Sequence, residues 1–335
     1  MTGFICEKEK NMAQLDRRTF ITSATALAAT GVVGPALSLP GVEGAEKRAV
    51  ERPRDEPFGY CFNTSTVRGQ KLDLKQQVQL VIDSGYHAIE PWMRDIQAYQ
   101  EAGGSLADIK KQLADANVTV ESAIGFARWI VDDPKERAKG LEDAKRDMGL
   151  LKQIGGVRIA APPVGATNQT DLDLFAAAKR YHALLEVGRA IGITPQVELW
   201  GFSKSLSRLG ELMFVAVESG HADACLLPDV YHIYKGGSDF HGLKLVNGQR
   251  IHVFHVNDYP AQPPRETIGD ADRVYPGDGV APLNQIFRDV YASGFRGMLS
   301  LELFNREYWK QDALKVARTG LEKTRQAVRQ AFAGR

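Results

Sequence analysis

The sequence predicts an α/β protein built as a single (β/α)8, or TIM, barrel. From Pro57 onward, short apolar runs rich in β-branched residues alternate with longer amphipathic stretches, and this unit repeats eight times. The eight units fill about 275 residues, which is the length of one such barrel. A doubly wound sheet is the competing fold, but residues 63–67 (NTSTV) lack the GxGxxG loop that usually follows its first strand.

The predicted strands are short apolar runs bounded by turn-forming or polar residues. They cover residues 58–63, 88–92, 118–123, 157–161, 195–200, 224–229, 251–257 and 298–304. Apolar residues at helical spacing, such as Leu74, Val78 and Val81, predict the helices between them. These helices cover residues 72–84, 106–116, 134–155, 172–191, 206–219, 283–293 and 313–328, while the sixth connection, near 239–245, shows only a weak pattern.

Residues 1–54 are expected to precede the barrel, which we place at residues 55–335. Residues 16–22 read Asp-Arg-Arg-Thr-Phe-Ile-Thr, and an Ala-rich apolar stretch follows from about Ala24 to Leu39. This is the order of a secretory signal, and the twin arginines resemble the signal of the twin-arginine (Tat) route, which exports folded proteins. We therefore expect a signal peptide and linker, with export to the periplasm. A plain N-terminal extension with a chance Arg-Arg pair is the alternative.

Composition excludes several classes of protein. The apolar stretch near the N-terminus is too short and too rich in Gly and Ala to form a stable membrane span. The formal net charge is +1, from 42 basic and 41 acidic residues, so no general attraction to nucleic acid is expected. The three cysteines share no CxxC spacing, and an odd number of them predicts neither a zinc ribbon nor a disulfide framework.

Side chains that can bind a metal ion lie at the C-terminal ends of four consecutive predicted strands. Glu198 lies near the end of strand five, Asp229 and His232 at the end of strand six, His255 near the end of strand seven and Glu302 near the end of strand eight. Any one of these would more often be a satisfied ion pair or core residue. Four in a row at the catalytic edge of a barrel favour a shared site, because three carboxylates facing one mouth would repel one another without a cation. The oxygen-rich donor set suits one divalent metal ion: Mn²⁺, Mg²⁺, Co²⁺ or Zn²⁺.

The motifs "VELW", "LPDVYH", "HVFHVND", "YPGDG" and "LSLELF" resemble the xylose-isomerase-like TIM-barrel superfamily of sugar phosphate isomerases and epimerases. The resemblance covers about residues 57 to 330. It implies that Glu198, Asp229, His255 and Glu302 bind one divalent metal ion. It also implies that the two glutamates serve as catalytic acid and base.

The same resemblance gives substrate-binding roles to residues around the metal site. His232, three positions after Asp229, would contact the substrate. An arginine beyond the metal-binding histidine also takes part in the family; here Arg273 is the candidate and Arg265 competes with it. Aromatic residues near strand ends could pack against a sugar, although plain core packing explains them equally well. These are Trp92, Phe126, Trp129 and Trp200.

The expected reaction is a proton transfer next to a carbonyl. A divalent metal ion stabilises the enediolate that forms when the carbon is deprotonated. Glu198 and Glu302 come from strands three apart, so they can flank the substrate, one removing a proton and the other returning it. An epimerase returns the proton to the opposite face of the same carbon. An isomerase returns it to the neighbouring carbon. We expect a metal-dependent sugar isomerase or epimerase.

Other functions are weighed against this one. An inositol-derivative dehydratase, or another lyase using the same enediolate, is the nearest rival. A non-catalytic, metal-dependent sugar-binding protein would not need both glutamates. Abasic-site endonucleases of the superfamily need further histidines after strands two and three, where this chain has "EPW" and "AIGF", so that activity is disfavoured.

The sequence shows no clear basic or backbone N–H cradle for a phosphate group. We therefore expect a small-molecule carbohydrate substrate that is a free or oxidised sugar or a polyol derivative. No nucleic-acid partner is expected. Relatives in the family often pair, so the resemblance also allows a homo-oligomer.

Overall fold

Strands and helices alternate along residues 56–334, which are the residues that the computed structural model describes. Eight short strands run in the order that the sequence predicts. They are β1 (Gly59–Asn63), β2 (Ala88–Glu90), β3 (Thr119–Val120), β4 (Arg158–Ala161), β5 (Thr194–Glu198), β6 (Leu226–Leu227), β7 (Val253–Val256) and β8 (Met298–Leu301). The expected signal segment, residues 1–54, lies outside the described residues.

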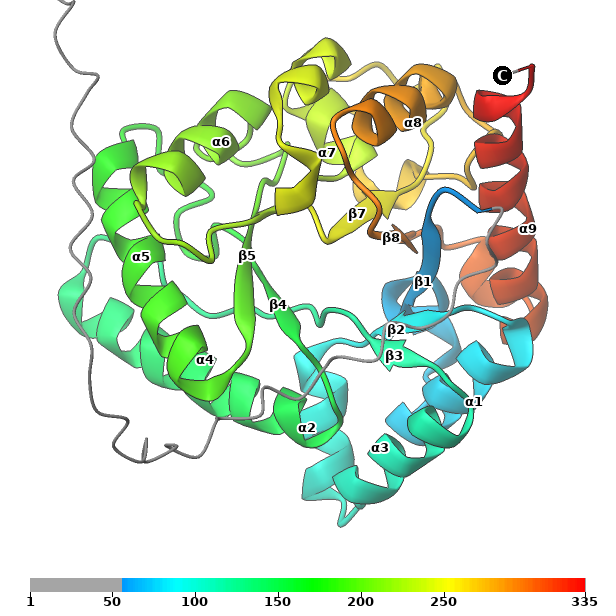
Figure 1. The fold of residues 1–335 in the computed structure, drawn as a ribbon, viewed down its shortest axis with the longest axis horizontal. Helices are drawn as coiled ribbons and strands as arrows, with labels where there is room; N and C mark the ends of the chain where they lie inside the picture. The colour runs from blue at the N-terminus through cyan, green and yellow to red at the C-terminus, as the bar shows by residue number, and fades with distance from the viewer. Residues whose placement is uncertain (1–55, 335) are drawn as a thin grey trace, which may run out of the picture. The chain divides into compact units, whose positions relative to one another are not determined.

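The strands close into a parallel barrel (Figure 1). Five strands pair in the order β3-β2-β1-β8-β7 and three in the order β4-β5-β6. Past the end of β3, the Ala123 N–H donates to the Arg158 carbonyl at 3.2 Å, and the Ala160 N–H donates to the Ala123 carbonyl at 2.8 Å. At the other gap, parallel bridges join Leu226 to Ile251 and Asp229 to His255. These contacts link the two sheets, so the predicted (β/α)8 barrel is confirmed.

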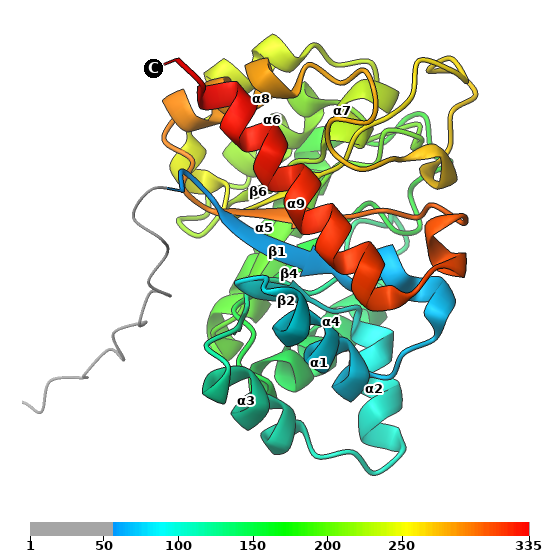
Figure 2. The ribbon, with the colours of Figure 1, turned by 90° about the vertical axis from the view of Figure 1, so that its right-hand side faces the viewer.

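Helices surround the strands, as Figures 1 and 2 show. The α-helices are α1 (Leu74–Ser84), α2 (Met93–Glu101), α3 (Leu106–Asp115), α4 (Pro134–Gln153), α5 (Leu174–Ile191), α6 (Leu209–Glu218), α7 (Val230–Lys235), α8 (Leu283–Ala292) and α9 (Ala313–Phe332). Short 3-10 helices add η1 (Thr64–Gln70), η2 (Phe240–Leu245), η3 (Gly248–Arg250), η4 (Asp270–Asp272) and η5 (Tyr308–Lys310). None of the helices within residues 56–334 combines the length and the apolar character needed to cross a bilayer.

Two of the α-helices, α2 and α7, were not predicted. α2 follows β2 directly and ends before Gly103 and Gly104, so the second connection holds two helices rather than one. α7 starts immediately after Asp229, whose side chain accepts a hydrogen bond from the His232 N–H at 2.8 Å and so caps the helix. The weak pattern near residues 239–245 corresponds to η2, a 3-10 helix.

A small apolar layer separates the two ends of the barrel interior. It consists of buried side chains from successive strands or their ends: Cys61, Ala88, Trp92, Ile124, Ala160, Leu227, Val253 and Met298. Side chains two apart on a strand point to the same face. His255 therefore points inward two residues after Val253, and Glu302 does so four residues after Met298. The polar site consequently stands on an apolar floor.

Candidate active site

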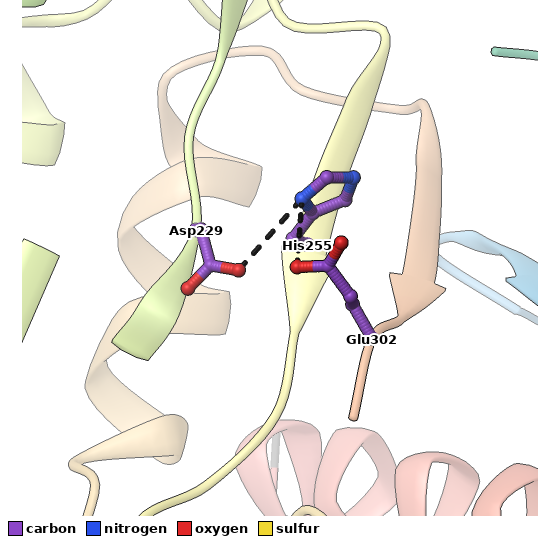
Figure 3. Close-up of side chains that lie close together, drawn as sticks. All are labelled: Asp229, His255 and Glu302. Atoms are coloured by element: carbon purple, nitrogen blue, oxygen red, sulfur yellow. Dashed lines mark ion pairs between the residues drawn. The ribbon is translucent and has the colours of Figure 1, made fainter. Parts of the chain in front are cut away.

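The structure brings together the four residues predicted as metal ligands. Glu198 ends β5, Asp229 precedes α7, His255 lies in β7, and Glu302 follows β8. The His255 Nδ1 atom lies 3.4 Å from Glu302 Oε2, 3.7 Å from Asp229 Oδ2 and 3.9 Å from Glu198 Oε1. Figure 3 shows the Asp229 and Glu302 carboxylates turned toward this ring nitrogen. One imidazole nitrogen thus faces three carboxylates.

These residues fit a divalent metal ion. Asp229, His255 and Glu302 can each offer a ligand atom, all within 4.8 Å of one another. His255 Nδ1 and Glu198 Oε2 are buried and have no hydrogen-bond partner among the described residues. Buried polar atoms without partners are uncommon in folded proteins. Three carboxylates and one imidazole are also a donor set that divalent ions of the zinc and manganese type accept.

The electrostatics of the site also favour a cation. Burial raises the pKa of Glu198 well above its usual range, and the neighbouring Glu302 and Asp229 add to the rise. Burial raises the pKa of Glu302 to about 7, although His255 and Arg273 oppose the shift. Burial also acts on Asp229, but Arg273 and its neighbours outweigh it and lower the pKa of that carboxyl. A bound dication would favour the ionised form of all three carboxylates.

Glu90 contacts Nε2 of His255, the ring nitrogen that does not face the three carboxylates. Its Oε2 atom lies 2.9 Å from His255 Nε2 and accepts hydrogen bonds from Asn63 Nδ2 at 3.0 Å and Ser300 Oγ at 2.7 Å. All four side chains are fully buried. A carboxylate on the far nitrogen fixes the ring and leaves the near nitrogen free for a ligand. Glu90 was not among the predicted site residues, although β2 ends in Glu just as β5 does.

Arg273 lies inside the site, with 1% of its surface exposed. Its Nη1 group donates to Glu302 Oε2 at 2.8 Å and to Asp229 Oδ2 at 3.2 Å. Its Nη2 group donates to His232 Nε2 at 3.0 Å and also to Asp270. Burial and the Arg273 charge lower the pKa of His232 to about 4, so this imidazole is neutral at pH 7. The competing candidate, Arg265, is instead exposed and pairs with its neighbour Glu266.

The site opens into a cavity of about 180 Å³. Both glutamates, His232, Arg273 and Asp270 line it together with an apolar wall of Trp92, Ile124, Phe126, Trp200, Phe202 and Phe304. Trp92, Phe126 and Trp200, which were expected near strand ends, therefore do line the cavity. Trp129 does not: it is fully buried, donates through Nε1 to the Pro162 carbonyl and packs against Tyr181, so for this residue plain core packing is the correct interpretation.

Asp258 holds the loop that brings in Arg273. Its carboxylate accepts hydrogen bonds from four backbone N–H groups, those of Tyr259, Gly277, Gly279 and Ala281, at 2.8 to 3.1 Å. Its backbone also pairs with Val274, the residue after Arg273. The loop after β7 is thereby tied to the barrel rim, which fixes the position of the arginine.

Comparison with known proteins identifies the family and supports the fold. The family described as xylose isomerase-like TIM barrel matches residues 78–327. An inosose isomerase of Bacillus velezensis is 24% identical over 275 residues, covering 81% of this chain and 98% of that protein. A 3-dehydroshikimate dehydratase of Pseudomonas aeruginosa is 24% identical over 235 residues, covering 69% of this chain and 36% of that protein. Among solved structures, that of the IOLI protein with a bound zinc atom superposes with a TM-score of 0.76 at 22% identity, covering 82% of this chain and 100% of that one.

Proposed function

Because the chain belongs to the xylose isomerase-like TIM barrel family, we propose that it is a divalent-metal-dependent isomerase or epimerase of a sugar or polyol ketone. One observation carries the proposal. Glu198 and Glu302, from strands three apart around the barrel, line one cavity and both lie within 3.9 Å of the same His255 nitrogen. The match to inosose isomerases along nearly their whole length supports the same class of reaction.

A divalent ion held by Glu198, Asp229, His255 and Glu302 would supply stabilisation of the negative charge that develops on substrate oxygens. One of the two glutamates removes the proton from the carbon beside the carbonyl. The other glutamate returns a proton to the neighbouring carbon or to the opposite face. The aromatic wall excludes water from the carbanion and packs against the C–H face of the substrate.

Arg273 and His232 complete the site. Arg273 donates to Glu302 Oε2 at 2.8 Å and Asn63 Nδ2 donates to Glu302 Oε1 at 3.1 Å, so both oxygens of this carboxylate are held in place. His232 is neutral and lines the cavity. Its ring nitrogens meet Arg273 Nη2 at 3.0 Å and the Gly201 N–H at 3.2 Å, so the ring is held at the cavity wall without adding charge there.

Deuterium exchange tests the proposal. The metal-loaded protein is incubated in deuterated water with a panel of ketoses and ketone polyols, and exchange is followed by NMR and mass spectrometry. Deuterium should enter the carbon next to the carbonyl of a substrate. Glu198→Gln and Glu302→Gln should each slow the exchange by about 10²–10⁴-fold, whereas Glu322→Gln, on the exposed face of α9, should not. Exchange that persists unchanged in both active-site variants would refute the assignment.

A dehydratase is the second candidate, because the chain also matches a 3-dehydroshikimate dehydratase. A dehydratase removes the same kind of proton but then expels a hydroxyl group. The two reactions differ in mass, since loss of water lowers the product mass by about 18 Da while isomerisation leaves it unchanged. Mass spectrometry of the product therefore separates the two candidates.

A further inference from the structure

A second cavity adjoins the catalytic one and is strongly basic. It has a volume of about 270 Å³ and lies beside Trp92, the residue that lines both cavities. Its other lining residues come from η1, the start of α1 and the start of α2: Thr64, Ser65, Val67, Arg68, Lys71, Leu72, Gln77, Arg94 and Asp95. We call it the basic cavity. The sequence showed no phosphate cradle because these residues are spread over 32 positions, from 64 to 95.

The charges in the basic cavity are unbalanced. Arg68, Lys71 and Arg94 are basic, and Asp95 is the one acidic residue among those lining it. Asp95 already pairs with Arg94 at 3.5 Å and accepts a hydrogen bond from Gln77 at 3.1 Å. Arg68 and Lys71 are exposed residues that line the cavity, and within residues 56–334 neither forms an ion pair with a carboxylate; Asp95 acts on Arg68 only at longer range. A protein whose total net charge is +1 concentrates positive charge at this place.

The two arginines are held together against repulsion. The Arg68 guanidinium lies 4.8 Å and the Arg94 guanidinium 4.3 Å from the centre of the Trp92 ring. Partial burial, and then the charge of Arg94, lower the pKa of Arg68. The indole attracts both cations, but it cannot neutralise them. An anion between them would relieve the repulsion.

Two buried hydroxyls at the same cavity have no partner. Thr64 is 3% exposed and Ser65 is 1% exposed, and both line the basic cavity. Neither Thr64 Oγ1 nor Ser65 Oγ has a hydrogen-bond partner among the described residues. Hydroxyls donate readily to oxyanions. They are therefore a second observation, independent of the charges, that points to a ligand with acceptor oxygens.

The segment that carries these groups is fixed in place. Asn63 caps η1 by accepting from the Ser65 N–H at 3.0 Å. Trp309 donates through Nε1 to the Ser65 carbonyl at 3.1 Å, and Gly69 packs so closely that a Cβ there would lie 2.2 Å from the Trp309 side chain. Gln70 donates to the carbonyls of Tyr308 and Gln311, both at 3.0 Å. A rigid segment presents its donors without an ordering cost when the ligand binds.

We propose that the basic cavity binds an oxyanion, a phosphate or carboxylate group, between Arg68, Lys71 and Arg94, with Thr64 and Ser65 as hydroxyl donors. The oxyanion belongs either to the far end of the substrate, which would then pass Trp92, or to a separate small anion. Both sources share the same chemistry. The site uses none of the proposed metal ligands, so binding there does not depend on the proposed function.

Titration calorimetry with inorganic phosphate at low ionic strength tests the site. It is run on the full chain with and without chelator, because phosphate also binds metals. Binding should survive chelation. Arg68→Gln and Arg94→Gln should each weaken it by about tenfold, as expected for one charged hydrogen bond. Thr64→Val, which changes no charge, should weaken it several-fold. Arg329→Gln makes the same charge change on α9 and should have no effect.

Kinetics separate the two sources of the anion. If the oxyanion is part of the substrate, Arg68→Gln should lower kcat/KM for a phosphorylated or carboxylated ketone and leave the neutral analogue unaffected. If it is a separate anion, free phosphate should change kcat/KM of a neutral substrate in the wild type but not in Arg68→Gln. Absence of phosphate binding in the chelated protein, or equal binding by wild type, Arg68→Gln and Thr64→Val, would overturn the proposal even if the enzyme turns out to be active.

Discussion

Replacing Glu90 by glutamine should weaken metal binding while leaving the barrel folded. The Glu90 carboxylate lies 2.9 Å from His255 Nε2 and is fully buried, so solvent does not screen its charge. Glutamine keeps the shape and one acceptor oxygen for the hydrogen bonds from His255, Asn63 and Ser300. It removes the negative charge that makes the imidazole a better ligand. Loss of such a supporting carboxylate typically costs 10–100-fold in metal affinity, or about 1.4–2.7 kcal/mol.

Competition with a chromogenic chelator measures this effect directly. The dissociation constant for Zn²⁺ or Mn²⁺ is determined for wild type, Glu90→Gln and the surface control Glu322→Gln. Thermal unfolding of the metal-free proteins checks that Glu90→Gln is still folded. Ser300→Ala removes one of the three donors and should weaken metal binding less than Glu90→Gln does. A Glu90→Gln protein that binds metal within twofold of wild type would show that Glu90 does not support a ligand.

Three further predictions follow from the same contacts. Chelation should abolish turnover and lower Tm, since a ligand at 100 times its Kd stabilises the native state by about 2.7 kcal/mol; calorimetry of the chelated and reconstituted protein checks this. In Arg273→Lys, the single ammonium group cannot donate hydrogen bonds to all four partners of the arginine, which are Asp229, Glu302, His232 and Asp270. We expect kcat/KM to fall by about 10-fold or more while the metal content stays near one ion per chain. Gly279→Ala would place a Cβ 2.2 Å from the Tyr259 carbonyl oxygen and 2.3 Å from Asp258 Oδ1. Urea denaturation should therefore show that the free energy of unfolding falls by about 1–3 kcal/mol. The control Gly149→Ala, whose Cβ meets nothing within 4 Å in helix α4, should leave stability unchanged or raise it.

The proximity of the four proposed metal ligands could be predicted from sequence because a barrel imposes it. All parallel strands deliver their carboxyl ends to one rim, so a ligand-type residue at each of four consecutive ends must lie near the others. This holds even for β6, which is only two residues long: Asp229 lies beyond it but still bridges to His255. Strand boundaries were less predictable, since the strand expected at residues 118–123 is reduced to Thr119–Val120.

The remaining parts of the site depend on contacts that no periodicity encodes. The loop after β7 carries two arginines. Hydrogen bonds that hold its backbone, to Asp258, Lys235 and Asn305 among others, place Arg273 in the site while Arg265 stays outside. Glu90 has the same strand-end signal as Glu198, but its role depends on which nitrogen of His255 it meets. The basic cavity needs η1 and α2 to meet across Trp92, and α2 itself was not predicted.

Anomalous diffraction from crystals soaked in Mn²⁺ or Zn²⁺ tests whether these four residues bind one metal ion. We expect one strong peak at the barrel mouth, bound by His255 Nδ1 and by carboxylate oxygens of Glu198, Asp229 and Glu302 at about 2.0–2.2 Å. A peak bound by other residues would contradict this shared metal site. So would the absence of a peak at this position at saturating metal with Arg273 still bridging Asp229 and Glu302.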